Sequence, residues 1–232
     1  MTTDKTGISM TVVAVGPGDP RMLTLRGRQA LESADLVTGF KTVLDVVAEW
    51  CGNAEMKPMS YRDQEEILEY TAAQAADGKK CVVCCWGDLN VSAAELLARV
   101  YRRAEDVELI PGISSIQMAC ARSGIAMEES LFITLHRRDG SESALSELEH
   151  YLGEGKRNII LLPRPFDLMP AQIAADLVSS GISADRPVTV YQRLTLEGEK
   201  AWTGTLAECA AITEDFSDLS IMVFLRSQNG AH

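Results

Sequence analysis

The sequence predicts an α/β protein built from two domains. Short apolar runs alternate with amphipathic helical patterns along almost the whole chain of 232 residues. Most of these runs are continuously apolar, which is typical of strands covered by helices on both faces of a sheet. About ten such runs are present, more than one sheet of typical size holds. We therefore expect two units with mostly parallel or mixed sheets, an N-terminal domain of residues 1–115 and a C-terminal domain of residues 116–232.

The strands are predicted from apolar runs of four to eight residues that end at turn-forming or charged residues. The run CVVCCW is typical of a strand that is buried on both faces. The predicted strands cover residues 11–15, 35–38, 81–86, 107–110, 131–136, 158–162, 187–194, 200–203 and 220–225.

The helices are predicted where apolar residues recur at helical spacing and a glycine follows. Capping-box spacing, Ser/Thr followed three residues later by Glu, marks two helix starts, at Ser92 and at Thr205. The other predicted helices cover residues 25–33, 41–50, 62–76, 114–123, 143–152 and 170–180.

The composition is that of an ordinary globular protein, with 46% hydrophobic and 24% charged residues. The formal net charge of −11 argues against nucleic acid and against an anionic membrane surface as partners, because both require a basic face. A small anionic substrate stays possible, since a few converging arginines can make one pocket positive.

The cysteines and the apolar runs indicate a cytoplasmic protein. No run approaches the ~18 apolar residues of a membrane span, and the first ten residues hold no apolar secretory segment. The six cysteines lack a second Cys/His pair at metal-ligand spacing. We expect reduced thiols packed in a buried strand, a reducing compartment and no metal site.

A glycine-rich turn follows the first predicted strand, at Gly16-Pro17-Gly18-Asp19-Pro20. Neither standard phosphate loop fits it. A dinucleotide fingerprint needs glycine where Arg21 stands, and a Walker loop needs Gly-Lys at Arg21-Met22. Pro17 also lacks the N–H that a phosphate cradle uses. The turn is suited to close approach of a ligand that does not need a phosphate cradle.

Two similar loops follow later strands, Trp86-Gly87-Asp88-Leu89-Asn90 and Pro111-Gly112-Ile113-Ser114-Ser115. Ligands of open α/β sheets bind at the carboxyl ends of strands, so the three loops together indicate a binding site. Each loop also has a simpler interpretation. The two aspartates can be turn residues, and either serine can be the N-cap of the next helix.

Residues for covalent catalysis are scarce. The chain has no G-x-S-x-G motif, and no carboxylate pair stands out. His136 ends an apolar strand before Arg137-Arg138, so it can face a cleft or be a noncatalytic histidine. No catalytic base is identified.

Three segments resemble the tetrapyrrole methylase family: residues 12–25, the Gly87-Asp88 loop, and residues 108–121, ELIPGISSIQMACA. The resemblance implies two α/β domains with an active-site cleft between them, S-adenosylmethionine as cofactor, a small-molecule tetrapyrrole substrate and a homodimer. The stretch Leu135-His136-Arg137-Arg138 and the strand end Leu162-Pro163 are similar to the branch that methylates precorrin carbon C5 in cobalamin biosynthesis. Trp86 and Leu89 depart from the usual family loop.

Site residues follow from the same resemblance. A methyl sulfonium is already electrophilic, so such an enzyme needs alignment rather than a nucleophile. The implied cofactor-binding residues are Pro17, Gly87, Asp88, Val91, Ser115, Ile116, Leu162 and Leu194. The implied substrate-binding residues are Asp19, His136, Arg137 and Arg138. Further arginines that could meet substrate carboxylates, or be surface charges, are Arg21, Arg26, Arg62 and Arg164.

Other functions stay open on the residues alone. A methyltransferase of the same superfamily could act on another precorrin carbon, on diphthamide or on a ribosomal RNA ribose, although the net charge weakens the RNA version. A non-catalytic nucleotide-binding α/β protein is the alternative from a different class. The fused enzymes of this branch carry a further decarboxylating domain, so the resemblance implies a separate partner for C15 methylation.

Overall fold

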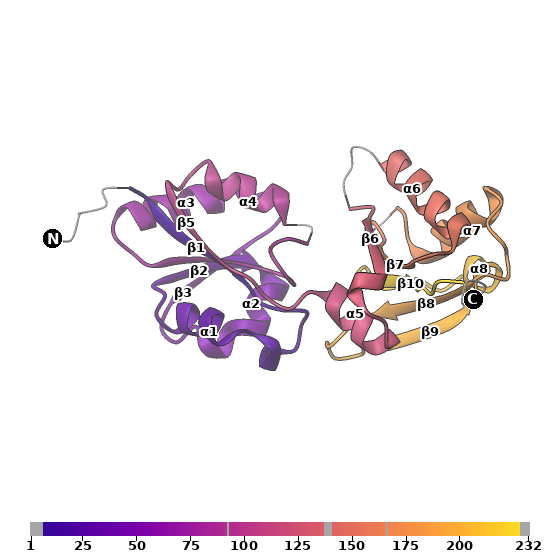
Figure 1. Cartoon of the computed structure of the whole chain (residues 1–232). Coiled ribbons are helices and arrows are strands. Elements are labelled where there is room, and N and C mark those ends of the chain that lie inside the picture. Colours follow the sequence, from indigo (N-terminus) through magenta and orange to yellow (C-terminus); the bar gives the residue numbers. More distant parts are fainter. Residues whose placement is uncertain (1–6, 92, 137–140, 166, 228–232) are drawn as a thin grey trace. The chain divides into compact units, whose positions relative to one another are not determined.

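The computed structural model describes residues 7–91, 93–136, 141–165 and 167–227 (Figure 1). The chain divides into two compact units, Met1–Ser114 and Ser115–His232, named unit 1 and unit 2. Each unit has one five-stranded sheet with helices packed against it, named sheet 1 and sheet 2. The predicted α/β class is confirmed in both units.

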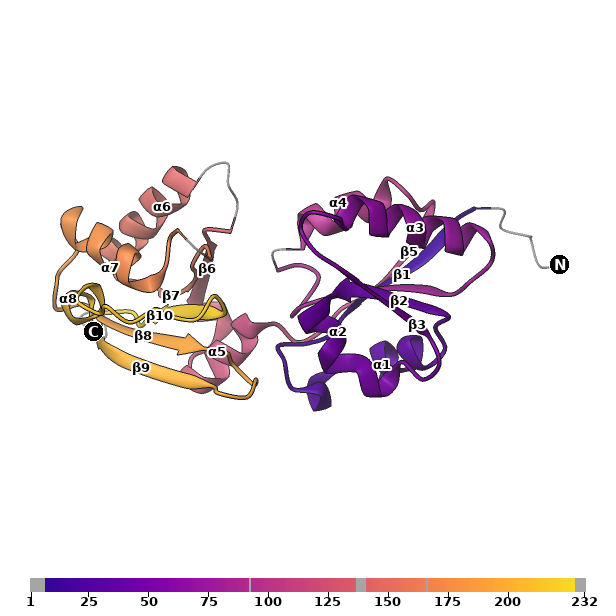
Figure 2. The same ribbon diagram turned by 180° about the vertical axis from the view of Figure 1, so that it is seen from behind.

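Every strand pair of sheet 1 is parallel, in the order β3-β2-β4-β1-β5. Helices α1 and α2 pack on one face and α3 and α4 on the other, as Figures 1 and 2 show from opposite sides. All five side chains of β4 are buried, which explains its continuous apolar run. The elements are β1 (Ser9–Ala14), α1 (Leu25–Glu32), β2 (Leu36–Phe40), α2 (Lys41–Val47), β3 (Glu55–Met59), α3 (Gln64–Ala76), β4 (Cys81–Cys85), α4 (Ala94–Tyr101) and β5 (Asp106–Ile110), with short 3-10 turns at Pro20–Met22 and Ala48–Trp50.

Strand β3 was not predicted from the sequence. Its residues, EMKPM, include a proline and a lysine, and only Met59 is buried. A proline cannot donate to a neighbouring strand, so it is tolerated at a sheet edge. Strand β3 is an edge strand of sheet 1, which explains why it lacks an apolar run.

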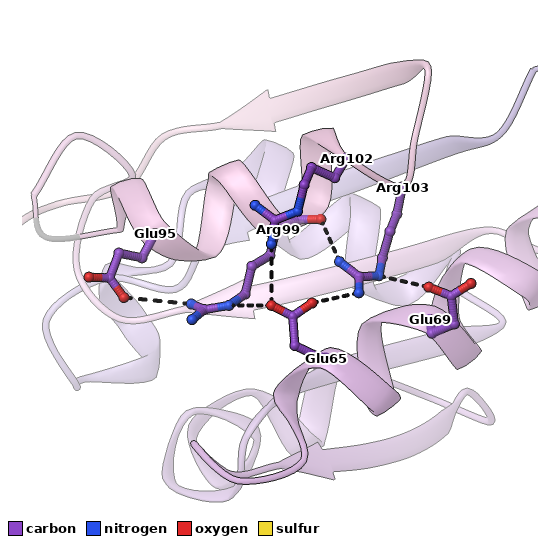
Figure 3. Close-up of polar contacts among 6 residues, drawn as sticks. All are labelled: Glu65, Glu69, Glu95, Arg99, Arg102 and Arg103. Carbon is purple, nitrogen blue, oxygen red and sulfur yellow. Dashed lines mark hydrogen bonds and ion pairs between the residues drawn. The ribbon is translucent and has the colours of Figure 1, made fainter.

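An ion-pair network joins α3 to α4 on the surface of unit 1 (Figure 3). Glu65 accepts from Arg99 Nε at 2.8 Å and from Arg103 at 2.5 Å. Arg103 also donates to Glu69 at 3.0 Å. The hydrogen bond from Arg103, followed by that from Arg99, lowers the pKa of the Glu65 carboxyl. Single surface pairs contribute little, but a shared carboxylate connects several at once. The network fixes α4 against α3.

Sheet 2 is mixed, in the order β6-β7-β10-β8-β9. Strands β6 and β7 are parallel, and the pairs β7–β10, β10–β8 and β8–β9 are antiparallel. Helices α6, α7 and α8 bury apolar residues on one face of the sheet, whereas α5 packs on β10. The elements are α5 (Ser115–Ser123), β6 (Ser130–Thr134), α6 (Ser141–Glu154), β7 (Asn158–Leu162), α7 (Pro170–Ser179), β8 (Pro187–Gln192), β9 (Lys200–Thr205), α8 (Leu206–Ala210) and β10 (Ser220–Phe224), with a 3-10 turn at Met127–Glu129.

The two predicted capping boxes differ in outcome. At α8 the Thr205 hydroxyl accepts from the Glu208 N–H and the Glu208 carboxylate accepts from the Thr205 N–H, so that prediction is confirmed. Helix α4 instead begins at Ala94 with Ala93 as its N-cap, and Ser92 lies outside the described residues. None of the helices in the described part of the chain is both long and apolar enough to cross a bilayer.

Candidate functional site

Two glycine loops are joined where β1 and β4 end, at the carboxyl edge of sheet 1. The Gly16 N–H donates to the Gly87 carbonyl at 3.2 Å, and the Gly87 N–H donates to the Gly16 carbonyl at 2.8 Å. Both residues have positive φ, 88° and 65°, a conformation that favours glycine. Neighbouring parallel strands end at the same edge, so the loops after β1 and β4 form one connected backbone surface.

The loop after β5 packs against this surface at Gly112. A Cβ atom at Gly112 would lie 2.6 Å from the Gly87 carbonyl oxygen and 2.7 Å from the Ala14 carbonyl oxygen. Only glycine fits at that distance. The Gly112 N–H also donates to Asp88 Oδ2 at 3.1 Å. The three candidate loops of unit 1 are therefore brought together, as the sequence predicted for strand ends.

Asp88 holds two of these loops in place. Its Oδ1 accepts from the backbone and side-chain nitrogens of Asn90, each at 2.9 Å, while Oδ2 binds the loop after β5. The Val91 N–H donates to the Asp88 carbonyl at 3.0 Å, which completes the turn. Leu89 is only 4% exposed and anchors the turn in the core. A carboxylate oxygen accepts more than one hydrogen bond, so Asp88 can still accept from a ligand.

The first loop also contains Pro17 and Asp19. Pro17 is buried beside the paired glycines. Asp19 accepts from the Arg21 backbone N–H at 2.9 Å and pairs with the Arg21 guanidinium at 2.6 Å. These hydrogen bonds lower the pKa of the Asp19 carboxyl. The geometry agrees with a turn residue, and the substrate-binding role of Asp19 stays a prediction.

A second edge gathers predicted site residues in unit 2. Strands β6, β7 and β8 run in the same direction, because β7 and β8 both pair antiparallel with β10. The Leu135 N–H donates to the Leu162 carbonyl at 2.9 Å, joining the ends of β6 and β7. Leu162 and Leu194 are only 6% and 4% exposed. This carboxyl edge of sheet 2 therefore offers buried apolar side chains.

His136 follows β6 at this edge. Its backbone N–H donates to Thr134 Oγ1 at 3.2 Å, and the residue is exposed. The surrounding protein nevertheless desolvates the imidazole and lowers its pKa, while a hydrogen bond to the Pro163 backbone opposes the shift. The neutral imidazole is therefore favoured near pH 7. Arg137 and Arg138 lie outside the described residues, so their role stays a prediction.

The loop between β8 and β9 carries Leu194 between two residues with unusual backbone angles. Arg193 has φ 54° and Thr195 has φ 67°, although neither is glycine. Glu199 holds the loop, accepting from the Thr195 N–H at 2.7 Å and from Arg122 Nε of α5 at 2.9 Å. The hydrogen bond from Arg122 lowers the pKa of the Glu199 carboxyl. Backbone strain of this kind clusters at ligand sites.

Ser115 and Ile116 are the first residues of α5, directly after the loop that contains Gly112. Ser115 is half-buried, and Ile116 is 4% exposed. The helix start thus combines one half-buried polar residue with one core side chain.

The candidate arginines differ in whether a protein carboxylate already pairs with them. Arg21 pairs with Asp19, Arg26 with Glu108 and Arg164 with Asp167. A guanidinium that already binds a protein carboxylate has fewer donors for a substrate. The exposed Arg62 has no such side-chain partner among the described residues.

The cysteines are not part of this arrangement. All six are buried and free. Burial raises the pKa of Cys85 to about 12, and it raises the pKa of Cys81 and of Cys209 to about 11. Such thiols stay protonated and unreactive at neutral pH. The described residues contain no group of three His, Cys, Asp or Glu that could hold a metal ion.

Sequence reasoning did not name Gly112 as a site residue, although it lay in a candidate loop. The Pro-Gly pair after a strand was the available signal, but the close approach to Gly87 depends on how the loops pack.

Comparison with known proteins gives consistent results. A family profile described as Tetrapyrrole (Corrin/Porphyrin) Methylases matches residues 9–210. The chain is 32% identical over 216 residues to a probable cobalt-precorrin-7 C(5)-methyltransferase of Methanocaldococcus jannaschii, covering 92% of this chain and 96% of that protein. It is 28% identical over 206 residues to a cobalt-precorrin-4 C(11)-methyltransferase of the same organism, covering 86% and 79%.

Solved structures share the fold. A precorrin-6Y methylase from Archaeoglobus fulgidus superposes with a TM-score of 0.67 at 20% identity, covering 95% of this chain and 100% of that one. A uroporphyrin-III C-methyl transferase from Thermus thermophilus, complexed with S-adenyl homocysteine, gives a TM-score of 0.70 at 19% identity, covering 94% and 92%.

Proposed function

Because the chain belongs to the tetrapyrrole methylase family, we propose that it is an S-adenosylmethionine-dependent C-methyltransferase of cobalamin biosynthesis. Its substrate would be of the cobalt-precorrin-7 or precorrin-6Y type, methylated at ring carbon C5. The relative that is 32% identical, and whose name specifies C5, supports this choice. A relative whose name specifies C11 is 28% identical, so another precorrin carbon is the second candidate.

The glycine-lined carboxyl edge of sheet 1 is the observation that carries the proposal. Gly16, Gly87 and Gly112 let the three loops approach one another through their backbones, at the sheet edge where ligands of open α/β sheets bind. The loops contain Asp88 but no lysine, so they suit a cofactor without phosphate groups. The residues thus fit S-adenosylmethionine. The proposed cofactor-binding residues are Pro17, Gly87, Asp88, Val91, Ser115, Ile116, Leu162 and Leu194.

The main task of the protein in this reaction is to align the methyl group of the cofactor with the substrate carbon. When bound, S-adenosylmethionine supplies an electrophilic methyl group, so no enzymic nucleophile is required. Asp88 would fix the loops and accept hydrogen bonds from the polar end of the cofactor. Leu162 and Leu194 would exclude water from its apolar part. Holding the two reactants in line contributes several kcal/mol to lowering the barrier.

Calorimetry and mass spectrometry test the proposal together. We expect S-adenosylmethionine to bind, and incubation with cobalt-precorrin-7 to add one methyl group to the product. Asp88→Ala should weaken cofactor binding at least tenfold, because it removes an acceptor and loosens two loops. The matched control is Asp45→Ala, which removes an exposed carboxylate paired with Lys41.

The possible outcomes separate the candidates. Absence of cofactor binding would refute every methyltransferase assignment. Methylation of cobalt-precorrin-4 in place of cobalt-precorrin-7 would favour the second candidate. Equal affinity of Asp88→Ala and wild type would refute the placement of the cofactor.

We also propose a cytoplasmic homodimer. The six free, buried cysteines support a reducing compartment. Light scattering on the purified protein tests the dimer, and a monomer at micromolar concentration would refute it.

A further inference from the structure

Arg62 differs from every other arginine in the described part of the chain. Each of the others donates to a carboxylate, a backbone carbonyl or a hydroxyl, or forms an ion pair with a carboxylate, whereas no described residue accepts from the Arg62 guanidinium. The chain carries 33 acidic and 22 basic residues, so carboxylate partners are abundant. An exposed guanidinium without a protein partner is available to a carboxylate from outside the chain.

Asp63 follows Arg62 in the chain but does not pair with its guanidinium, because the Asp63 carboxylate accepts hydrogen bonds from Ser60. Asp63 Oδ1 accepts from the Ser60 N–H at 2.5 Å and from the Ser60 hydroxyl at 2.9 Å. These hydrogen bonds lower the pKa of the Asp63 carboxyl. The Arg62 N–H donates to Ser60 Oγ at 3.3 Å. The turn between β3 and α3 is thereby fixed while the guanidinium stays available.

Tyr61, the residue before Arg62 in the chain, presents an exposed aromatic ring. The residue is 86% exposed, which is unusual for a large aromatic side chain. Its ring centroid lies 4.8 Å from that of Phe40, the last residue of β2, with the planes tilted by 51°. Phe40 therefore supports one side of the ring, and the rest is free to pack against a flat ligand.

Both residues lie at the edge where the cofactor is proposed to bind. In sheet 1 the order β3-β2-β4 places the end of β3 two strand spacings from the Gly87 loop. With neighbouring strands ~4.8 Å apart, this separation is about 10 Å. A broad tetrapyrrole ring with carboxylates on its rim can span it.

We infer that Tyr61 and Arg62 bind the substrate of this enzyme. Tyr61, supported by Phe40, packs against one face of the macrocycle, and Arg62 pairs with a carboxylate on its rim. The inference rests on the proposed function and adds to it two residues that select a polycarboxylate tetrapyrrole.

Titration with uroporphyrin III, a stable tetrapyrrole with carboxylates around its rim, tests the pair by fluorescence. Arg62→Ala should weaken binding about tenfold, since it removes a charge-assisted contact. Tyr61→Ala should weaken binding several-fold and Tyr61→Phe should not, because the ring rather than the hydroxyl makes the contact. In turnover, Arg62→Ala should raise KM for the precorrin while S-adenosylmethionine affinity is unchanged.

Two matched controls lie away from this edge. Lys80→Ala removes another exposed cation, directly before β4 at the opposite end of the strand, and Tyr101→Ala removes another exposed tyrosine. Both should bind uroporphyrin like wild type. If Arg62→Ala and Lys80→Ala bind equally well, the inference is wrong while the proposed function stands. If wild type binds S-adenosylmethionine but neither uroporphyrin nor a precorrin, the proposed substrate and this inference fail together.

Discussion

The carboxyl edges of the two sheets are built in different ways. In sheet 1 the loops are held by backbone hydrogen bonds between Gly16 and Gly87 and by the close approach of Gly112. In sheet 2 the loop that carries Leu194 makes one backbone hydrogen bond to the segment before β10, from the Arg193 N–H to the Leu219 carbonyl at 2.9 Å, and is held further by the ion pair of Arg122 with Glu199.

The difference follows from strand direction. All strands of sheet 1 are parallel, so every strand ends at the same edge and adjacent loops can bond through their backbones. In sheet 2, β10 runs in the opposite direction between β7 and β8. The ends of β7 and β8 are therefore separated by one strand, so their loops are not adjacent, and the ion pair adds a side-chain contact that holds the loop after β8. We expect the first edge to tolerate substitution poorly and the second to adjust.

The largest effect is expected at Gly112. In Gly112→Ala the new methyl group would meet two carbonyl oxygens within 2.7 Å, so the loops must separate. We expect a loss of about 3 kcal/mol in the free energy of unfolding, together with weaker cofactor binding. Urea unfolding measures the first and calorimetry the second. Gly153→Ala in α6 is the control, because its Cβ meets open space and alanine favours a helix. If Gly112→Ala lowers the free energy of unfolding by less than about 0.5 kcal/mol, which is the size of a typical surface effect, the close packing is contradicted.

High pH should destabilise unit 1 more than unit 2. Burial raises the pKa of Cys85 to about 12 and that of Cys81 to about 11, above the ordinary thiol value of 9.0, and it raises the pKa of Cys84 as well. Above pH ~9 the unfolded chain loses these protons while the folded chain keeps them, so stability falls as pH rises toward the folded pKa values. Each thiol contributes at most about 1.4 kcal/mol per pH unit.

Hydrogen exchange at pH 8 and pH 10 can follow each unit separately. Unit 2 has Cys209, with a pKa of about 11, and Cys120, whose pKa is raised less. Cys85→Ala should reduce the alkaline loss of unit 1. An equal loss in both units would contradict this prediction.

The carboxyl edge of sheet 1 could be predicted from the sequence better than that of sheet 2. Continuous apolar runs predicted the strands, and loops with glycine at three strand ends predicted where they would meet. The family resemblance, carried by these loops, is confirmed. The partners of Asp88 depend on how the loops pack, which no residue pattern reveals. Arg62 was among the arginines predicted to meet substrate carboxylates, but Tyr61 was not predicted, because β3, with Pro58 at a sheet edge, lacks an apolar run. The assignments of individual site residues to cofactor or substrate stay predictions.

Loosening the loop at the carboxyl edge of sheet 2 should change cofactor affinity more than the free energy of unfolding. Glu199→Gln weakens the ion pair with Arg122. The Arg122 side chain is 46% exposed and the Glu199 side chain 29% exposed. Such pairs contribute about 0.2–1 kcal/mol. If Leu194 binds the cofactor as proposed, cofactor affinity should fall several-fold when its loop loosens, and a double-mutant cycle with Arg122→Ala measures the coupling. Glu108→Gln, which breaks the surface pair with Arg26, is the control. Unchanged affinity would mean that the pair only supports the fold.

The smallest effect is expected at Thr195, where stability and binding should change in opposite directions. A β-branched residue at φ 67° is strained, and glycine adopts this conformation freely. Thr195→Gly should therefore raise the free energy of unfolding by about 0.5 kcal/mol, the relief of strain exceeding the entropy gained by the unfolded chain. Thr203→Gly, in the extended strand β9, should lower it instead. If the strained backbone holds Leu194 against the cofactor, the more stable Thr195→Gly protein should bind S-adenosylmethionine more weakly than wild type. If Thr195→Gly is more stable than wild type and binds S-adenosylmethionine with the same affinity, the backbone strain has no part in binding.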